Sequence, residues 1–357
     1  MHRRYNNLPP IDEETMTPNW KNFLASQGAR FEADEASNFG DAQAELKATA
    51  ADTVLAPLTQ FSLIRAAGED AASFLHNLFS NDVQHLGRDR AERCGFCSPK
   101  GRLLADFLIW RENHDYLLQI SADIQPAILK KLGMYVLRSK VKISDAGSEF
   151  VLLGVAGSGA ATALMALGMD IPAAPLDVVR FDGGSVIRLD GQRYQVAVYA
   201  ESFAQVWARL ASAARPVGTP VWRWLEIEAG IPHITLPTQE EFVPQMANLE
   251  LLGGVSFTKG CYPGQEVVAR TKYLGKVKRR TYRAHIDDGC PLPGTDLYSP
   301  DLPDQSCGKV IEAAPSPEGG CELLASMLMA SAEVGEVHVG SADGPRLAFR
   351  SLPYPLD

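Results

Sequence analysis

The sequence lacks most of the short motifs from which an enzyme class is usually recognised. It contains no P-loop, no G-x-G-x-x-G dinucleotide fingerprint and no G-x-S-x-G nucleophile elbow. Its seven histidines are dispersed and show none of the spacings that zinc ligands require. These absences argue against the common kinds of nucleotide binding, against serine hydrolysis and against a zinc site, and we expect no resident metal.

Long apolar runs are also missing. No uninterrupted hydrophobic stretch reaches the ~18 residues that a membrane helix needs. The two arginines near the N-terminus are followed by no apolar segment of the signal-peptide kind. Six cysteines in 357 residues do not make a disulfide framework. We therefore expect a cytoplasmic protein with no membrane partner.

Only one cysteine pair has a spacing that is typical of metal or redox sites. Cys94 and Cys97 form a C-x-x-C, but there is no second pair and no nearby histidine. We favour two structural cysteines. The alternative, in which both join Cys261 to hold a cluster transiently, stays open.

The charge is unevenly distributed along the chain. The formal net charge is −9, and residues 284–357 alone hold twelve Asp or Glu against three Lys or Arg. Residues 270–283, in contrast, carry seven basic residues and no acid. This run is either an ordinary solvated face or a basic rim suited to a polyanion, such as RNA or a polyglutamylated cofactor.

The order of expected elements predicts an α+β protein of two or three domains. We interpret residues 1–50 as an N-terminal extension that is partly ordered at best. Residues 51–147 form a first α+β domain, completed by 217–274 and containing a hairpin over 103–121. Residues 148–216 follow a ferredoxin-like order, and short strands rich in Pro and Gly over 275–357 predict a small β-barrel. Between them, Thr219-Pro220 signals the start of a helix that Gly230 and Pro232 end.

The most distinctive stretch is Lys259-Gly260-Cys261-Tyr262-Pro263-Gly264-Gln265-Glu266. Pro263 and Gly264 predict a tight turn, and a helix is expected to begin at Gln265. Such a turn favours an exposed thiol, and Lys259 and the helix N-terminus would stabilise its thiolate. The residues alone leave open whether Cys261 is reactive or is a buried structural cysteine.

Two carboxylates stand in unusual places. Asp106 lies within the apolar strand 103–108, on the face that a hydrophobic strand would bury, where a carboxylate needs a partner or a purpose. An edge-strand Asp bonded to a loop explains it equally well. Glu228 falls in the last turn of its helix, where an acid opposes the helix dipole, so another group must compensate for it.

These features together resemble a known family. The octapeptide around Cys261 looks like the signature of the YgfZ proteins, folate-binding relatives of the glycine cleavage T-protein with roles in iron–sulfur enzyme maintenance and tRNA modification. Glu228-Ala229-Gly230 resembles the T-protein segment whose glutamate holds the pterin ring. The segment Pro99–Asp106 resembles the T-protein turn and strand that carry an acidic pair, although here the pair has become Ala105-Asp106.

The resemblance implies a T-protein-like, three-lobed architecture with ferredoxin-like units, a C-terminal small β-barrel and a cleft for tetrahydrofolate. The residues it implies are Glu228 for the pterin, Asp106 near the one-carbon centre, Trp222 and Phe61 as aromatic walls, Cys261 as the reactive thiol, and Lys259 and Arg270 as sources of positive charge. The implied partners are folate, iron–sulfur client enzymes and tRNA, the last through residues 270–283.

Two other functions fit parts of the sequence. A true folate-dependent aminomethyl or methyl transferase would share the fold but would not need Cys261, and it normally has the acidic pair that Ala105 interrupts. An RNA-binding module would use the basic run 270–283 and would bind RNA with a steep salt dependence. We favour an accessory factor in iron–sulfur cluster assembly or repair over both.

Overall fold

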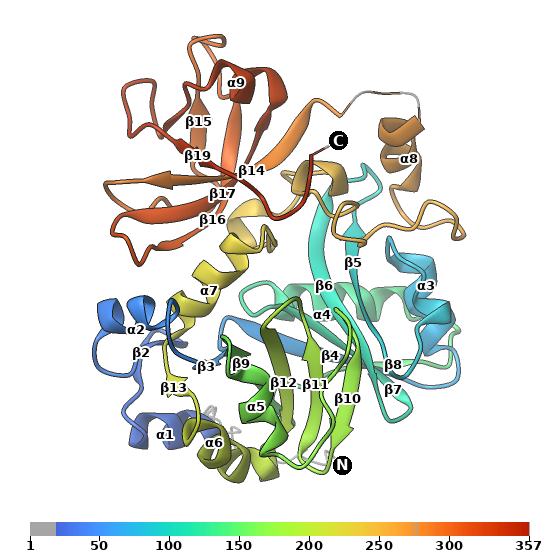
Figure 1. Ribbon diagram of the computed structural model, residues 1–357. Coiled ribbons are helices and arrows are strands. Elements are labelled where there is room, and N and C mark those ends of the chain that lie inside the picture. The colour runs from blue at the N-terminus through green and yellow to red at the C-terminus, as the bar shows by residue number, and fades with distance from the viewer. Residues whose placement is uncertain (1–18, 274, 276, 357) are drawn as a thin grey trace, which may run out of the picture.

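The computed structural model describes residues 19–273, 275 and 277–356. In these residues the strands form four sheets, and helix α7 (Thr219–Glu228) runs diagonally between the upper and lower parts of the molecule (Figure 1). None of the described helices combines the length and the apolar character needed to span a bilayer.

The first large sheet carries the hairpin that the sequence predicts. Its strands, in spatial order, are β5 (Ala91–Cys97), β6 (Leu103–Glu112), β7 (Asp115–Ser121), β4 (Phe61–Ala67) and β8 (Lys142–Asp145). Helices α3 (Ala71–Leu78) and α4 (Gln125–Tyr135) pack against it. All of its strand pairs are antiparallel.

The second large sheet includes a strand that we expected in the first domain. Its order is β10 (Val178–Phe181), β11 (Gly184–Arg188), β12 (Arg193–Tyr199), β9 (Phe150–Ala156), β3 (Val54–Pro57) and β13 (Arg215–Pro216), with α5 (Ala160–Met165) and α6 (Phe203–Ala211). Strand β3 pairs with β9 and β13, so residues 54–57 belong to this sheet and not to the first. The pairing partners lie about a hundred residues or more away, beyond what a local pattern can indicate.

The C-terminal sheet is curled into half a barrel. Its order is β18 (His338–Val339), β15 (Asp296–Tyr298), β16 (Gly308–Pro315), β17 (Cys321–Leu328), β14 (Arg279–Ile286) and β19 (Ala348–Arg350), with the short helix α9 (Met329–Val334) beside it. A disulfide joins Cys290, in the loop after β14, to Cys321 at the start of β17. The cysteine count gave no sign of this bond.

The N-terminal segment, which we expected to be partly ordered at best, forms regular elements from residue 19 onward. It forms α1 (Asn19–Ser26), the hairpin β1 (Arg30–Glu32) and β2 (Glu35–Asn38), and α2 (Ala42–Ala48). Leu24 is fully buried, and the rings of Phe23 and Phe203 lie 5.3 Å apart. These few apolar side chains pack on α6 even though the segment is too short to have a core of its own. Residues 1–18 lie outside the described residues.

Helix α7 begins one residue earlier than its capping signal suggests. Gly218 is the N-cap residue, while the Thr219 hydroxyl donates to the carbonyl of Pro57, 3.2 Å away. The helix ends at Glu228, and Gly230 follows with a φ of +66°. The helix packs against β16 and β17 on one side and β3 on the other, so it joins the C-terminal sheet to the rest of the molecule.

Candidate functional site

Cys261 lies in an exposed loop just before α8 (Gln265–Tyr273), and it is the exposed thiol among the four free cysteines that the structure describes. Gly264 shapes this loop. Its φ is +80°, and a Cβ at this position would lie 2.5 Å from the carbonyl oxygen of Ser98. The loop is therefore pressed against the turn that joins β5 to β6, and the sulfur stays at the surface.

Lys259 anchors the same loop. The side chain is largely buried, and its ammonium donates to the carbonyls of His76 and Phe79, the latter at 2.6 Å. These carbonyls end helix α3, where the helix dipole favours a cation. Burial lowers the pKa of Lys259 to about 8, while nearby acidic groups, Cys261 among them, pull in the opposite direction. The expected contribution to the thiolate stays a prediction, but the anchoring contact is an additional role that the sequence did not indicate.

Arg270, the other expected source of positive charge, is exposed in the last turn of α8. It makes no ion pair with any other residue that the structure describes. The side chain is therefore available to a ligand, although nothing in the structure brings it to Asp106 or Glu228.

Asp106 has the partners that its buried position requires. One carboxylate oxygen accepts a hydrogen bond from the backbone N–H of Ile234 at 2.6 Å, and the other lies 2.9 Å from Nδ1 of His233. The opposite ring nitrogen of His233 lies 3.3 Å from an oxygen of Glu226, a buried residue of α7. A single imidazole thus bridges two carboxylates from different elements.

The bridging imidazole is held in its charged form. Burial alone would lower the pKa of His233, but the charges of Glu226 and Asp106 and their hydrogen bonds outweigh it and raise the pKa well above its ordinary value. Neither His233 nor Glu226 was singled out from the sequence. Glu226 is only two residues from Glu228, but this spacing places the two on different sides of the helix.

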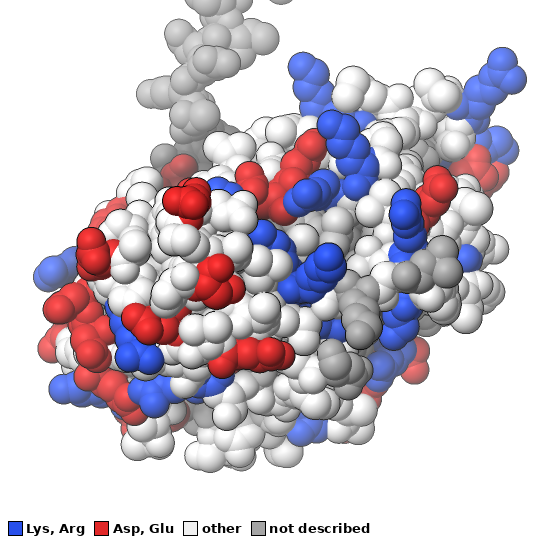
Figure 2. All heavy atoms as spheres, turned by 90° about the horizontal axis from the view of Figure 1, so that it is seen from above, with Lys and Arg blue, Asp and Glu red and all other residues white. Residues whose placement is uncertain are grey.

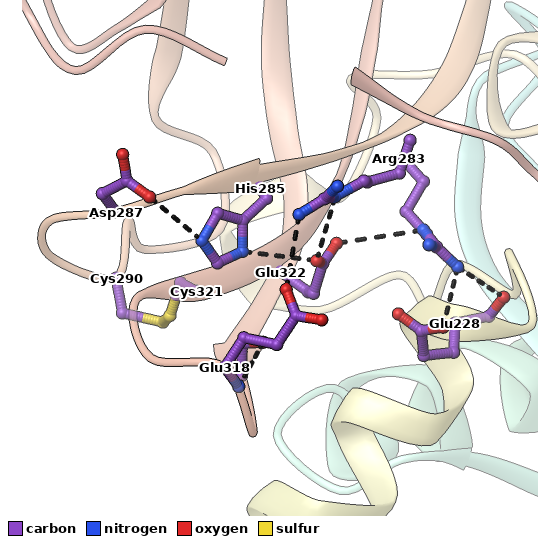
Figure 3. Close-up of polar contacts among 10 residues, drawn as sticks. Glu228, Arg283, His285, Asp287, Cys290, Glu318, Cys321 and Glu322 are labelled. Atoms are coloured by element: carbon purple, nitrogen blue, oxygen red, sulfur yellow. Dashed lines mark hydrogen bonds and ion pairs between the residues drawn. A yellow bond between two sulfur atoms is a disulfide. The ribbon is translucent and has the colours of Figure 1, made fainter. Parts of the chain in front are cut away.

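Glu228 has a partner from the C-terminal sheet (Figure 3). Nη1 of Arg283, on β14, lies 2.8 Å from the Glu228 carboxylate, and Nε of the same arginine lies 3.8 Å from Glu322 on β17. His285 approaches the other oxygen of Glu322 at 3.3 Å. Arg283 therefore provides the compensation that an acid at a helix C-terminus needs, and it links the end of α7 to the strands beside the Cys290–Cys321 disulfide.

A pocket of about 300 Å³ opens next to the Asp106–His233 pair, between the N-terminal segment and α7. Its polar lining includes Glu35, Gln60, Arg223, His233 and Glu312. Gln60 is largely buried, yet neither atom of its amide group is hydrogen-bonded within the described part of the chain, and one oxygen of Glu312 is also unpaired. Buried polar atoms without partners are costly, so these groups favour a polar ligand.

A second cavity, of about 190 Å³, continues the first. The two share Asp34, Thr59, Phe61 and Ala122, and the second is lined mainly by apolar side chains such as Leu58 and Phe150. Together they form one recess with a polar end and an apolar end. Residues of the N-terminal segment form part of the wall of both cavities.

The two expected aromatic walls have different surroundings. Phe61 lines both cavities, and its ring lies 4.8 Å from the ring of His233 in an edge-to-face arrangement. Trp222 has no exposed surface and packs against Gly154, where a Cβ would lie 2.4 Å from the indole. Trp222 therefore belongs to the core and lines neither cavity in this structure.

Arg93, on β5, is a further residue that the sequence did not single out. Its backbone carbonyl accepts a hydrogen bond from the Asn81 amide at 2.8 Å, while its partly exposed side chain makes no hydrogen bond or ion pair with the described residues. Burial and the charge of Arg193 lower its pKa, against the opposing charges of Glu226 and Asp106. An unpaired guanidinium close to these acids is suited to an anionic or carbonyl group of a ligand.

Comparison with known proteins decides the family. The model of the GCVT N-terminal domain family matches residues 22–257. The "tRNA-modifying protein YgfZ" of Yersinia pestis strain Pestoides F is 31% identical over 259 residues, which cover 72% of this chain and 78% of that protein. The protein of the same name from Colwellia psychrerythraea is 29% identical over 311 residues, covering 85% and 94%. The chain belongs to the YgfZ family.

A solved structure confirms the fold expected for a YgfZ protein. The glycine cleavage system aminomethyltransferase T from Bartonella henselae superposes with a TM-score of 0.78, covering 94% of this chain and 96% of that one, at 18% sequence identity. The predicted T-protein-like α+β architecture is therefore correct. At this identity the likeness shows the fold alone.

The two cysteines of the C-x-x-C in this YgfZ protein lie in the hydrophobic core. Cys94 and Cys97 are both buried, and they pack in different hydrophobic clusters. The burial of Cys94 raises its pKa well above the ordinary value, and burial raises the pKa of Cys97 to about 12. Both sulfurs are thus held as thiols, which are poor metal ligands.

Proposed function

We propose that this YgfZ protein binds tetrahydrofolate and acts in the assembly or repair of iron–sulfur clusters. Through this role it would act in tRNA thiolation, and the sulfur of Cys261 would be its reacting atom. The observation that carries the proposal is the exposed thiol of Cys261, held by Gly264 and Lys259 at the surface beside helix α8. The names of the YgfZ relatives support the link to tRNA modification.

The unpaired polar groups of the recess match the hydrogen-bonding groups of the cofactor. A pterin ring presents a ring N–H and an amino group side by side, next to a carbonyl, so it needs acceptors and a donor at close quarters. The amide of Gln60 offers one of each, and the unpaired oxygen of Glu312 offers a further acceptor. Phe61 supplies an aromatic face, and the apolar cavity beyond it would take the benzoyl part of the cofactor. When bound, the folate would supply a one-carbon carrier.

Glu228 and Asp106 have different roles in this proposal. Glu228 lines neither cavity of the recess, so its contact with the pterin is proposed from the family resemblance alone; Arg283 holds one oxygen of its carboxylate, and the second stays available to a pterin N–H. Asp106 acts through His233, which lines the pocket, because both of its oxygens already accept hydrogen bonds. Arg93 and Arg270 are the cations that we assign to the carboxylates of the folate tail.

We also propose that tRNA contacts the basic face around α8. Figure 2 shows acidic side chains gathered over the C-terminal sheet on the left and basic side chains from the middle to the right. Within residues 270–283, however, Arg280 and Arg283 pair with Glu250 and Glu228 inside the protein. Among the described residues of this run the exposed cations are Arg270, Lys272 and Lys278, so the contact surface that we propose there is narrower than the sequence run.

The thiol assignment is tested in cells that lack the endogenous protein, with iron–sulfur enzyme activity and thiolated tRNA as readouts. We expect Cys261→Ser to fail to restore either, while the matched control Cys307→Ala, which changes a buried free thiol, restores both. Full restoration by Cys261→Ser would reject the central role of this residue.

The folate assignment is tested by anaerobic calorimetric titration with tetrahydrofolate. Gln60→Leu removes both unpaired amide atoms, and we expect roughly tenfold weaker binding, the usual cost of one or two hydrogen bonds. Gln305→Leu, an exposed glutamine away from the pocket, is the control and should leave the affinity unchanged. Absence of binding to the unmodified protein would remove the cofactor from the proposal.

A further inference from the structure

We infer that His76, oriented by Asp82, accepts the thiol proton of Cys261 and so generates the thiolate. The inference rests on the proposed function, because it takes Cys261 as the reacting atom. It adds a residue that no sequence motif indicated.

The position of His76 carries the inference. It lies in the last turn of α3, with 9% of its surface exposed. Its Nε2 faces the Cys261 loop, 3.7 Å from the place that a Cβ on Gly260 would take. Gly260 directly precedes Cys261, so the imidazole lies beside the backbone that presents the thiol. Because Gly260 has no side chain, the imidazole of His76 can lie close to the backbone of the loop.

Asp82 stands behind the ring. Its carboxylate lies 3.0 Å from Nδ1 of His76, within ion-pair range although not aligned as a hydrogen bond, and 2.9 Å from Nδ1 of the exposed His85. A carboxylate at Nδ1 favours the tautomer whose Nε2 is unprotonated, and it stabilises the imidazolium that forms when Nε2 takes a proton. The ammonium of Lys259, which anchors the loop, donates to the backbone carbonyl of His76 itself. The loop is therefore tied directly to the residue that carries the imidazole.

The protonation states suit this transfer. Burial and the charge of Lys259 lower the pKa of His76, against the opposing effect of Asp82, so the ring is neutral near pH 7 and free to accept a proton. For Asp82, burial alone would raise the pKa, but the contacts with His85 and the charge of His76 lower it overall, so the carboxylate is ionised.

The neighbouring strand adds one further titratable group. Glu92, on β5, has its pKa raised to about 7 by burial and by the charge of Asp82, and Lys259 opposes this shift. The ionisable groups that act on the ring are Asp82, His85 and Lys259. Glu92, Cys94 and Cys261 act in turn on Lys259.

The step is a simple proton transfer. The S–H bond of Cys261 breaks, its proton moves to Nε2 of His76, and the electron pair stays on sulfur. With iodoacetamide as the probe, this pair forms the S–C bond while the C–I bond breaks and iodide leaves. No oxidant or reductant takes part.

The test is the pH profile of Cys261 alkylation by iodoacetamide, quantified by mass spectrometry on the peptide that carries Cys261. We expect the profiles of His76→Gln and Asp82→Asn to move to higher pH, with the rate at pH 7 reduced roughly fivefold or more, as for a thiol that has lost an imidazole partner. His114→Gln, in the exposed turn between β6 and β7, should leave the profile unchanged.

The design separates a chemical role from a structural one. A general loosening of the loop would change the rate at every pH but would not move the profile along the pH axis. If His76→Gln does not fold, Asp82→Asn decides, because this partly exposed carboxylate keeps its shape as an amide. Profiles that coincide with that of the unmodified protein would overturn the inference. Full restoration by Cys261→Ser in cells, together with shifted profiles, would instead reject the proposed function and keep the proton transfer.

Discussion

The proton on His233 links the stability of the fold to pH. Its pKa lies well above the ordinary value of about 6.5 that the unfolded chain has. A raised pKa means that the folded state binds this proton more tightly than the unfolded state does. The stabilisation is therefore fully present below about pH 6.5 and is lost as the pH rises through the folded-state pKa.

Asp106→Asn tests this linkage. We expect the variant to have a lower free energy of unfolding, by roughly 3 kcal/mol at pH 6, because one partner of a buried pair is removed. The difference should shrink as the pH rises above about 6.5. Urea unfolding between pH 5 and pH 9 measures it, and Asp115→Asn, which removes a longer and more exposed ion pair with Arg65, is the control. A difference that stays constant with pH would contradict the charged His233.

Gly264 is the residue on which the Cys261 loop depends. Gly264→Ala combines a positive φ with a clash against the Ser98 carbonyl, so we expect a lower melting temperature together with altered Cys261 reactivity. Gly253→Ala is the matched control, because its φ is +73° but a Cβ there meets nothing within 4 Å. It should show only the strain, about 1–2 kcal/mol. Equal effects of the two substitutions would show that the packing of Gly264 does not matter.

At the scale of elements, the N-terminal segment is part of the folded structure. Leu24 of α1 is fully buried, so Leu24→Ala should lower the free energy of unfolding by about 2–5 kcal/mol. Leu137→Ala, at a leucine with 86% of its surface exposed, should change it by less than about 0.5 kcal/mol. Chemical denaturation of both variants gives the comparison. If Leu24→Ala behaved like the control, the packing of α1 would contribute nothing to stability.

Elements that the sequence predicted are those with local signals. The hairpin 103–121 and the helix beginning at Gln265 follow from alternation and from Pro263-Gly264, and the structure confirms both. The helix that Thr219-Pro220 announces is also present. The N-terminal segment was missed because its apolar residues become a core only against α6, in a different part of the chain.

The site shows the same division. Cys261 was found because its loop is specified by adjacent residues, whereas His233 meets Asp106 across 127 positions and Arg283 meets Glu228 across 55. No periodicity marks such pairs, since each member looks like an ordinary residue of its own element. The position of Glu228 signalled that a partner must exist, but only the fold shows which residue it is.

At the scale of the whole molecule, the Cys290–Cys321 disulfide closes the C-terminal sheet on itself. The two cysteines are 31 residues apart, and a bond that closes a loop of this length stabilises a fold by about 3–4 kcal/mol. We expect a reducing agent to lower the free energy of unfolding by this amount, while Cys290→Ser should respond to the agent hardly at all. An unmodified protein that is equally stable with and without reductant would contradict the contribution of the bond.

The disulfide also bears on the expected compartment. Such bonds are rare in a reducing cytoplasm, so the cytoplasmic location that we propose requires a fold that survives without this one. The unfolding measurement in reductant gives that answer directly, because it reports how much stability remains.

One wall of the recess beside His233 is formed by the N-terminal segment. Lys21 pairs with Asp34 at 2.5 Å inside the N-terminal segment, and Glu35 pairs with Arg223 at 3.0 Å, so the second ion pair joins this segment to α7 at the recess. The rate at which a guest leaves the recess then depends on this ion pair as well as on the groups that hold its ring, because Arg223 also pairs with Glu312. Loosening the segment would therefore shorten the residence time of the guest.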